Sequence, residues 1–216
     1  MNRGLKISLA LAAIFITVWA TVLLFNDNDQ DPVASELNTT TAELVRPDSR
    51  SLNSVPGSNV TFVEFLDFEC EACRSAYPMI EQLRAEYGDQ VNFVVRYFPI
   101  ASHFNAERAA RAVEAAAQQG KFEQMYQRMY ETQTEWGEQQ TPKDDVFRGF
   151  AVDLGLDMTA FDAAYSAPKT LDRIRLDVAD GRALGVQGTP TFFVNGQQLE
   201  PSTYKDLTDA LDAALG

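Results

Sequence analysis

A pair of cysteines three positions apart constrains the fold of this chain more than any other feature. Cys70 and Cys73 directly follow an apolar run of strand length, residues 60–68, and they open an amphipathic helical stretch that continues to about Tyr87. The 216 residues include no other cysteine, which excludes a scaffold of several disulfides. A zinc site normally needs four ligands, and two cysteines with a single histidine do not supply them. The sequence therefore predicts one local thiol pair at a strand-to-helix junction.

The elements around this pair predict an α/β fold. Residues 91–98 form a second apolar strand, close enough after the helix for a right-handed strand-helix-strand unit with parallel strands. From about Asn105 the apolar periodicity is helical for roughly seventy residues. Strand character returns at residues 191–194, Asn195-Gly196 predicts a hairpin turn, and an amphipathic helix ends the chain. The expected architecture is a small sheet interrupted in sequence by a helical block.

The first 25 residues predict a membrane anchor. Residues 7–25 are all apolar or small hydroxyl residues, and a helix of 19 residues roughly matches the ~30 Å hydrocarbon core of a bilayer. Arg3 and Lys6 precede this run and acidic residues follow it, so the positive-inside rule leaves the N-terminus in the cytoplasm and the cysteines outside. A cleaved signal peptide, giving a secreted or periplasmic protein, is the alternative. Either interpretation places the thiol pair where a disulfide persists.

Composition divides the rest of the chain. Residues 26–57 are rich in Asp, Asn, Thr, Ser and Pro without periodicity, which predicts a flexible linker. The expected domains are thus an anchor at 1–25, this linker, and a folded domain at 58–216 with a helical insert at about 101–168. The formal net charge of -13 argues against nucleic acid and anionic lipid as partners. Contact with a membrane is expected only through the N-terminal helix.

Several local features match a known family in kind, order and spacing. They are the segment 68–73 with both cysteines, Glu64 in the strand before it, Pro78 in the helix after it, the segment 186–191 (Val-Gln-Gly-Thr-Pro-Thr), and Phe98-Pro99 with His103 before an alanine-rich helix. Together these features resemble the DsbA-like disulfide oxidoreductases of the thioredoxin superfamily, over residues 58–216. The dipeptide between the cysteines, Glu71-Ala72, departs from the Cys-Pro-His-Cys pattern of strongly oxidising members. The direction of catalysis therefore stays open.

The resemblance implies a thioredoxin fold with an inserted helical domain, preceded here by one transmembrane helix. It implies that the Thr189-Pro190 bond is cis and faces the cysteines, so that Gly188, Thr189 and Pro190 offer backbone groups to an extended substrate peptide. An ordinary turn before a strand is the alternative for this segment. The implied partners are thiol-containing protein substrates and a quinone-linked membrane protein that re-oxidises the pair.

The residues themselves suit thiol-disulfide exchange. Cys70 at the first turn of a helix faces unpaired N–H groups and the positive end of the helix dipole, which favour its thiolate. Cys73 lies one turn further, where it can resolve a mixed disulfide, so the cycle needs neither cofactor nor metal. Burial in an apolar strand should raise the pKa of Glu64 and let it relay a proton to Cys73, unless it is a surface acid. His103 is expected to be a capping or surface residue outside the site.

Three functions follow as candidates. The first is an extracytoplasmic dithiol oxidase that introduces or exchanges disulfides in secreted or surface proteins through Cys70 and Cys73. The second is a reductase or isomerase with the same fold in the same location. The third is a non-catalytic binding or chaperone module in which the pair is a structural disulfide, and unreactive cysteines would favour it.

Overall fold

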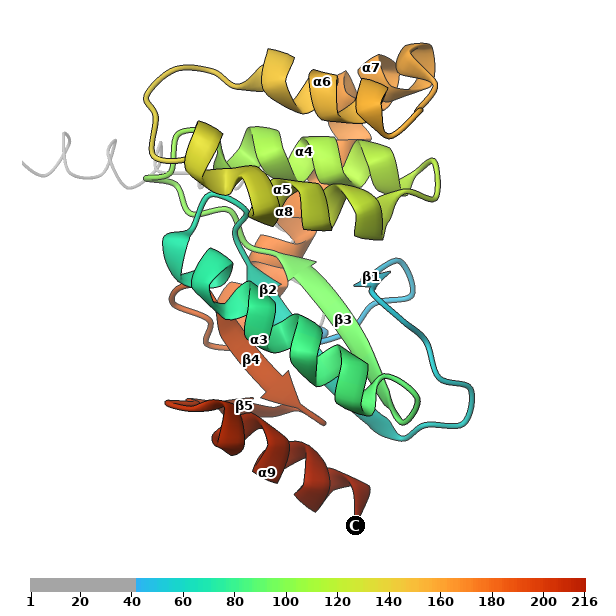
Figure 1. The fold of residues 1–216 in the computed structure, drawn as a ribbon, viewed down its shortest axis with the longest axis vertical. Coiled ribbons are helices and arrows are strands. Elements are labelled where there is room, and N and C mark those ends of the chain that lie inside the picture. Colours follow the sequence, from blue (N-terminus) through green and yellow to red (C-terminus); the bar gives the residue numbers. More distant parts are fainter. Residues whose placement is uncertain (1–41) are drawn as a thin grey trace, which may run out of the picture. The chain divides into compact units, whose positions relative to one another are not determined.

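The computed structural model describes residues 42–216 (Figure 1). The transmembrane helix expected at residues 7–25 and the first part of the expected linker lie outside the described residues. Within residues 42–216, no helix is both long enough and apolar enough to cross a membrane. The expected thioredoxin-like α/β architecture with a helical insert is confirmed in this part of the chain.

One mixed sheet forms the centre of residues 42–216, with strand order β1-β3-β2-β4-β5. Its central strand β2 is parallel to β3 and antiparallel to β4. Helix α3 (Glu71–Tyr87) connects β2 to β3, which is the predicted strand-helix-strand unit. Asn195 and Gly196 both have positive φ, 46° and 88°, in the predicted hairpin turn between β4 and β5. The strands are β1 Arg50–Ser51, β2 Val60–Leu66, β3 Val91–Tyr97, β4 Thr191–Val194 and β5 Gln197–Leu199.

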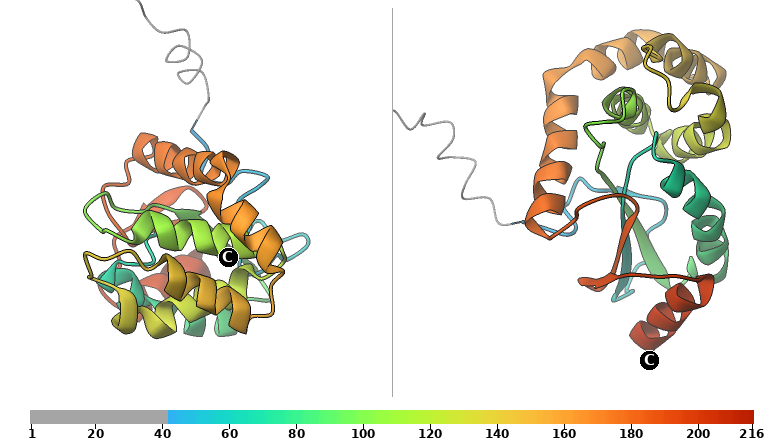
Figure 2. Two further views of the ribbon diagram at one scale, coloured as in Figure 1. Left: turned by 90° about the horizontal axis from the view of Figure 1, so that it is seen from above. Right: turned by 90° about the vertical axis from the view of Figure 1, so that its left-hand side faces the viewer.

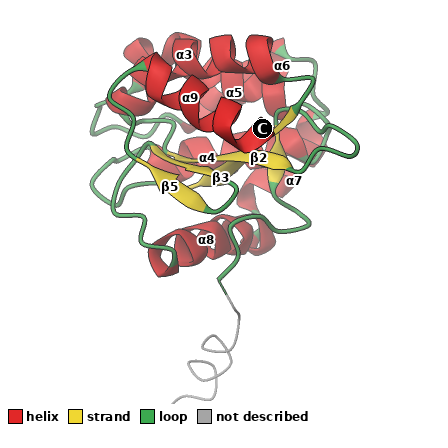
Figure 3. Ribbon diagram, turned by 90° about the horizontal axis from the view of Figure 1, so that it is seen from below, coloured by secondary structure: helices red, strands yellow, loops and turns green. Residues whose placement is uncertain are grey.

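Helices cover both faces of this sheet. Helices α3 and α9 lie on one face and α8 on the other, and the remaining helices gather beyond the end of the sheet at which α3 begins (Figures 2 and 3). The helical insert was expected to end at about residue 168, yet α8 continues to Ala183 and packs back against β3. The helices after α3 are α4 Ala106–Ala117, α5 Phe122–Trp136, α6 Asp144–Asp153, α7 Met158–Ser166, α8 Pro168–Ala183 and α9 Tyr204–Leu215.

The strand before the cysteines is buried on both faces, as expected for a central parallel strand. Phe62 packs against the rings of Phe93 and Phe192 on one side, and Phe65 packs against Phe98 on the other. Because side chains alternate along a strand, Glu64 shares the face of Phe62, which is the face covered by α3. The strand therefore carries an acid into the core beneath the helix that begins after Cys70.

Residues 42–57, which their polar composition assigned to a linker, belong to the compact unit of residues 42–216. Strand β1 pairs with β3. The buried guanidinium of Arg96 donates to the backbone carbonyl oxygens of Glu43, at 2.7 Å, and Leu44, at 2.6 Å. The same group forms ion pairs with Asp177 and Asp180 of α8. Hydrogen bonds to the backbone thus order a segment that has few apolar side chains, which composition alone does not reveal.

Candidate active site

The two cysteines occupy different positions at the start of α3. Cys70 is the N-cap residue and is 8 % exposed, whereas Cys73 lies one turn inside the helix and is fully buried. Both are free thiols. The Thr189-Pro190 bond is cis, as expected, and Sγ of Cys70 lies 3.4 Å from the backbone carbonyl oxygen of Thr189, to which it donates when protonated. The fold therefore brings the cysteine motif and the proline segment together across more than a hundred residues.

The environment of the pair shifts the two pKa values in opposite directions. A hydrogen bond with the Cys73 thiol is the main cause that lowers the pKa of Cys70 to about 5; Thr189 and the backbone N–H groups of Cys73 and Ala72 add to this effect, and burial opposes it. Burial raises the pKa of Cys73 well above its ordinary value, and the Cys70 side chain and the charge of Glu64 raise it further. Cys70 is therefore a thiolate at neutral pH, and Cys73 keeps its proton.

Glu64 is a core residue, so its interpretation as a surface acid is wrong. Its side chain is 3 % exposed, and burial raises its pKa to about 8, with the charges of Glu81 and Cys70 adding to the shift. Its charge in turn raises the pKa of Cys73. Near neutral pH this carboxyl can hold or release a proton close to the buried thiol.

Asp67 is a component of the site that the sequence analysis missed. Its carboxylate is 1 % exposed and accepts hydrogen bonds from the backbone N–H groups of Glu69, at 2.8 Å, and Ile100, at 2.9 Å. Its backbone carbonyl accepts from the N–H of Cys70 at 3.2 Å. Asp67 therefore ties the loop before α3 to the segment that leads into α4. An acid inside the apolar run before the cysteines was the signal that could have identified it.

His103, which was expected to be a capping or surface residue outside the site, lies against Asp67. Its Nδ1 lies 2.7 Å from Oδ2 of Asp67, and its side chain is 24 % exposed. The hydrogen bond to Asp67 is the main cause that raises the pKa of His103 to about 9; burial opposes it, and the charges of Asp67, Cys70 and Glu138 support it. The imidazole is therefore a cation at neutral pH. Only the fold, which brings the segment after β3 to the end of β2, reveals this proximity.

The helical insert also holds the cysteine loop. The side chain of Gln133, on α5, donates to the backbone carbonyl oxygens of Phe68, at 2.7 Å, and Cys70, at 3.0 Å. The Glu69 carboxylate accepts from the N–H of Asn105 at 2.5 Å, immediately before α4. These bonds fix the backbone around Cys70 from two elements that are distant from it in sequence.

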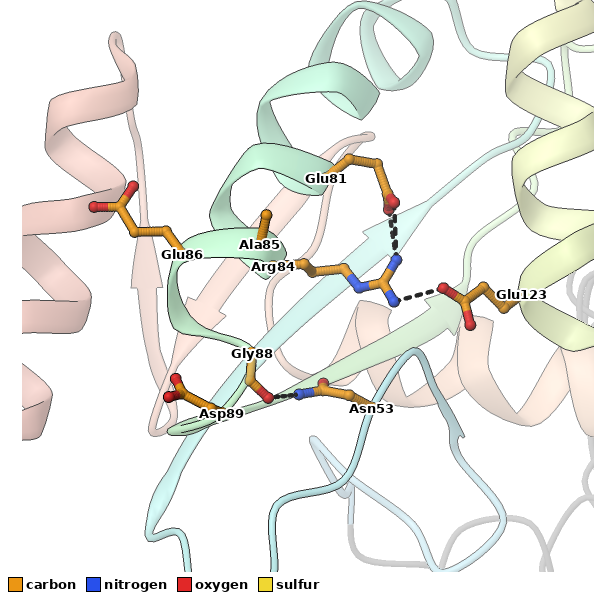
Figure 4. A pocket seen from close by; sticks show the side chains of 8 residues that line it. All are labelled: Asn53, Glu81, Arg84, Ala85, Glu86, Gly88, Asp89 and Glu123. Atoms are coloured by element: carbon orange, nitrogen blue, oxygen red, sulfur yellow. Dashed lines mark hydrogen bonds and ion pairs between the residues drawn. The ribbon is translucent and has the colours of Figure 1, made fainter.

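Two cavities bear on the position of the site. A cavity of about 560 Å³ is lined by Gly188, Thr189 and Pro190, the three residues expected to bind substrate, and by their neighbours. Another, of about 650 Å³, lies at the C-terminal end of α3, where Arg84 bridges Glu81 and Glu123 (Figure 4). The cysteines are at the opposite end of the helix, so this second cavity is not part of the site. Among residues 42–216, no group of three or more His, Cys, Asp or Glu side chains is arranged to hold a metal ion.

Comparisons with known proteins agree with this geometry. The profile of the family described as Thioredoxin matches residues 55–213. A thioredoxin-like oxidoreductase from Silicibacter pomeroyi DSS-3 superposes with a TM-score of 0.66 at 29 % identity, over 78 % of this chain and 93 % of that one. Wolbachia pipientis alpha-DsbA1 gives 0.69 at 18 % identity, over 80 % and 94 %, and oxidised BdbD from Bacillus subtilis gives 0.67 at 19 %, over 77 % and 92 %.

Curated relatives by sequence are longer proteins. Na(+)/H(+) antiporter NhaA 1 of Mycobacterium sp. (strain KMS) is 34 % identical over an alignment of 216 positions, gaps included, which covers 97 % of this chain but 33 % of that relative. Na(+)/H(+) antiporter NhaA of Herminiimonas arsenicoxydans is 34 % identical over 171 residues, covering 79 % of this chain and 26 % of that relative. The chain thus spans about a third or less of these relatives.

Proposed function

Because this chain belongs to the thioredoxin family and has the fold of its DsbA-like members, we propose that it is a thiol-disulfide oxidoreductase that acts as a dithiol oxidase on secreted or surface proteins. The observation that carries the proposal is the opposite shift of the two thiols, with the pKa of Cys70 lowered to about 5 and that of Cys73 raised. A structural disulfide in a binding or chaperone module needs no such asymmetry. The pair therefore favours exchange chemistry over the non-catalytic alternative.

The oxidised enzyme holds a disulfide between Cys70 and Cys73. A substrate thiolate attacks the sulfur of Cys70, forms a mixed disulfide and releases Cys73, which takes a proton from the Glu64 carboxyl. A second substrate thiolate then attacks the substrate sulfur of the mixed disulfide and expels Cys70. Two electrons pass to the enzyme, and the substrate leaves with a new disulfide. The low pKa of Cys70 makes it a good leaving group in the second step.

The cavity at the proline segment supports binding of an extended peptide. Gly188, Thr189 and Pro190 line it, and the Thr189 carbonyl oxygen already contacts the Cys70 sulfur. A substrate backbone that pairs with this segment would place its own sulfur in line with Cys70, with little dependence on side-chain sequence. Broad specificity for thiol-containing proteins follows.

The direction of exchange follows from the same thiolate. Stabilising Cys70 as an anion stabilises the reduced form of the enzyme and makes its disulfide a stronger oxidant. This favours the oxidase over a reductase or isomerase. The test is the equilibrium of the Cys70-Cys73 pair with glutathione. We expect a potential between those of thioredoxin and DsbA, ~-270 and ~-120 mV, and a value at or below the former would promote the reductase.

The proposed location is extracytoplasmic, with the N-terminal apolar run as a single-pass membrane anchor or a cleaved signal, and with a quinone-linked membrane protein as the re-oxidising partner. The support is the run of 19 apolar and small hydroxyl residues between basic and acidic flanks. Protease accessibility in intact cells and in spheroplasts tests it. A protected domain in both would place the enzyme on the other side of the membrane.

A further inference from the structure

We propose that His103, held by Asp67, is a positioning residue for the redox reaction, because its positive charge stabilises the Cys70 thiolate. This inference rests on the proposed function, because a thiolate matters only if Cys70 exchanges disulfides. It assigns a role to two residues outside the cysteine motif.

The contact between His103 and Asp67 is held in place by surrounding hydrogen bonds. The Asp67 carboxylate is 1 % exposed and is held by the N–H groups of Glu69 and Ile100 as well as by Nδ1 of His103 at 2.7 Å. The backbone N–H of His103 donates to the carbonyl oxygen of Ile100 at 3.0 Å. His103 is thus fixed to Ile100, and Ile100 is fixed to Asp67. The backbone carbonyl oxygen of Asp67 in turn accepts from the N–H of Cys70.

The sequence around Cys70 is acidic. Asp67, Glu69 and Glu71 all lie within three residues of Cys70, and this stretch contains no basic residue before Arg74. Negative charges near a thiol disfavour its anion. The His103 cation offsets them, and the basic side chain that follows it, Arg108, is engaged with Asp144.

The charges of His103 and Cys70 influence each other. The charges that support protonated His103 are those of Asp67, Cys70 and Glu138, in addition to its hydrogen bond. The two charges are therefore coupled, and protonated His103 favours the Cys70 thiolate in addition to the larger effect of its hydrogen bonds. The disulfide form carries no charge at Cys70, so this coupling stabilises only the reduced enzyme. It raises the reduction potential.

The experiment compares His103→Gln with His103→Lys in the purified protein. Gln keeps a polar side chain without charge, whereas Lys restores the charge without the ring. The readouts are the pKa of Cys70, from the thiolate absorbance of the reduced protein, and the equilibrium constant with glutathione. Arg111→Gln, which removes a cation from an exposed ion pair with Glu107 on α4, is the control for net charge.

We expect His103→Gln to raise the pKa of Cys70 and to shift the glutathione equilibrium three- to tenfold toward the oxidised enzyme, where tenfold corresponds to about 30 mV. His103→Lys should recover at least half of both shifts, and Arg111→Gln should change neither. Equal shifts in the Gln and Lys variants would show a purely structural role and overturn the proposal. So would a wild-type Cys70 pKa retained in His103→Gln.

A second measurement needs no variant. The pKa of His103 in the wild-type protein, followed by NMR, should be higher in the reduced state than in the oxidised state, because only the reduced state carries the thiolate. Equal values would overturn the proposal even if the variants fail to fold. Failure of the proposed function would look different, because Cys70 would then resist alkylation in the reduced wild-type protein.

Discussion

Cys70 and Cys73 are one helical turn apart, yet their surroundings shift the two thiol pKa values in opposite directions. Cys70 caps α3, keeps 8 % of its surface exposed and faces N–H groups that favour an anion. Cys73 is fully buried, and Glu64 adds a nearby negative charge when ionised. A shift of three residues along a helix therefore separates a nucleophile from a resolving thiol.

The opposite pKa shifts of the two thiols arise from tertiary contacts as well as from their positions in the helix. The loop of Cys70 is held by Gln133 of α5, by Thr189 and by the segment around His103. Cys73 depends instead on the strand beneath it, which carries Glu64. The two thiols also act on each other through their hydrogen bond, whereas Gln133 and Glu64 each lie on one side of the pair.

The largest expected effect comes from exchanging either cysteine for alanine. Cys70→Ala should abolish exchange and trap few substrates. Cys73→Ala should accumulate mixed disulfides, because no resolving thiol remains, and its Cys70 pKa should rise because the main hydrogen bond that lowers it is lost. Alkylation of the reduced wild-type protein should label Cys70 first, with half its maximal rate near pH 5. Labelling of Cys73 first would reverse the assignment of nucleophile and resolving thiol.

Glu64→Gln should alter both stability and the Cys73 step. The folded-state pKa of Glu64, about 8, is above its ordinary 4.5, so the folded protein holds this proton more tightly than the unfolded chain does. Its stabilising contribution is complete below about pH 4.5 and is lost as pH rises through 8. The variant cannot ionise and avoids this loss. The difference in the free energy of unfolding, variant minus wild type, should therefore increase by roughly 2–4 kcal/mol from pH 4.5 to pH 8.5.

Urea unfolding of both reduced proteins at pH 4.5 and at pH 8.5 measures this gain. Cys70 titrates in both proteins, so its contribution largely cancels from the difference. Release of substrate from the mixed disulfide in the reductive direction, where Cys73 attacks, should be slower in Glu64→Gln because the proton acceptor is missing. A stability difference that does not change with pH would place the Glu64 carboxyl in contact with water.

Gln133→Ala addresses the Cys70 side alone. It removes the donor to the carbonyl oxygens of Phe68 and Cys70, both in a buried setting, and should lower the free energy of unfolding by about 1–3 kcal/mol. The alkylation rate of Cys70 should also change, because its loop loses two hydrogen bonds that fix its backbone. Thr132→Ala, which removes a hydroxyl that bonds within α5, is the matched control and should cost less. An effect confined to stability would assign Gln133 a structural role only.

Much of this fold could be predicted from the sequence because its signals are local. The apolar strands, the cysteine motif, the Asn195-Gly196 turn and the amphipathic stripes each lie within a few residues, and the structure shows elements at these places. The order of residues 42–57 could not be predicted, because it depends on bonds from Arg96, some fifty residues away in sequence.

The same distinction holds for the site. The burial of Glu64 and the position of the proline segment followed from strand pattern and resemblance, and both are confirmed as geometry. For His103 the sequence predicts a capping or surface residue, because a lone histidine gives no partner in sequence. Its partner Asp67 lies 36 positions earlier, and the two meet only when the segment after β3 folds beside the end of β2.

The smallest change in reduction potential is expected from Glu71, the exposed residue that follows Cys70. Glu71 is the first residue of α3 and its side chain is exposed, so water and salt screen its charge from Cys70. A full unit in the Cys70 pKa would correspond to about 30 mV, and screening should leave less. Glu71→Gln should therefore raise the reduction potential by less than 30 mV, measured against glutathione at low and at high salt. A shift that exceeds this value, or that persists in high salt, would mean that Glu71 acts on the thiolate through the protein interior, and the proposed importance of His103 would then be reduced.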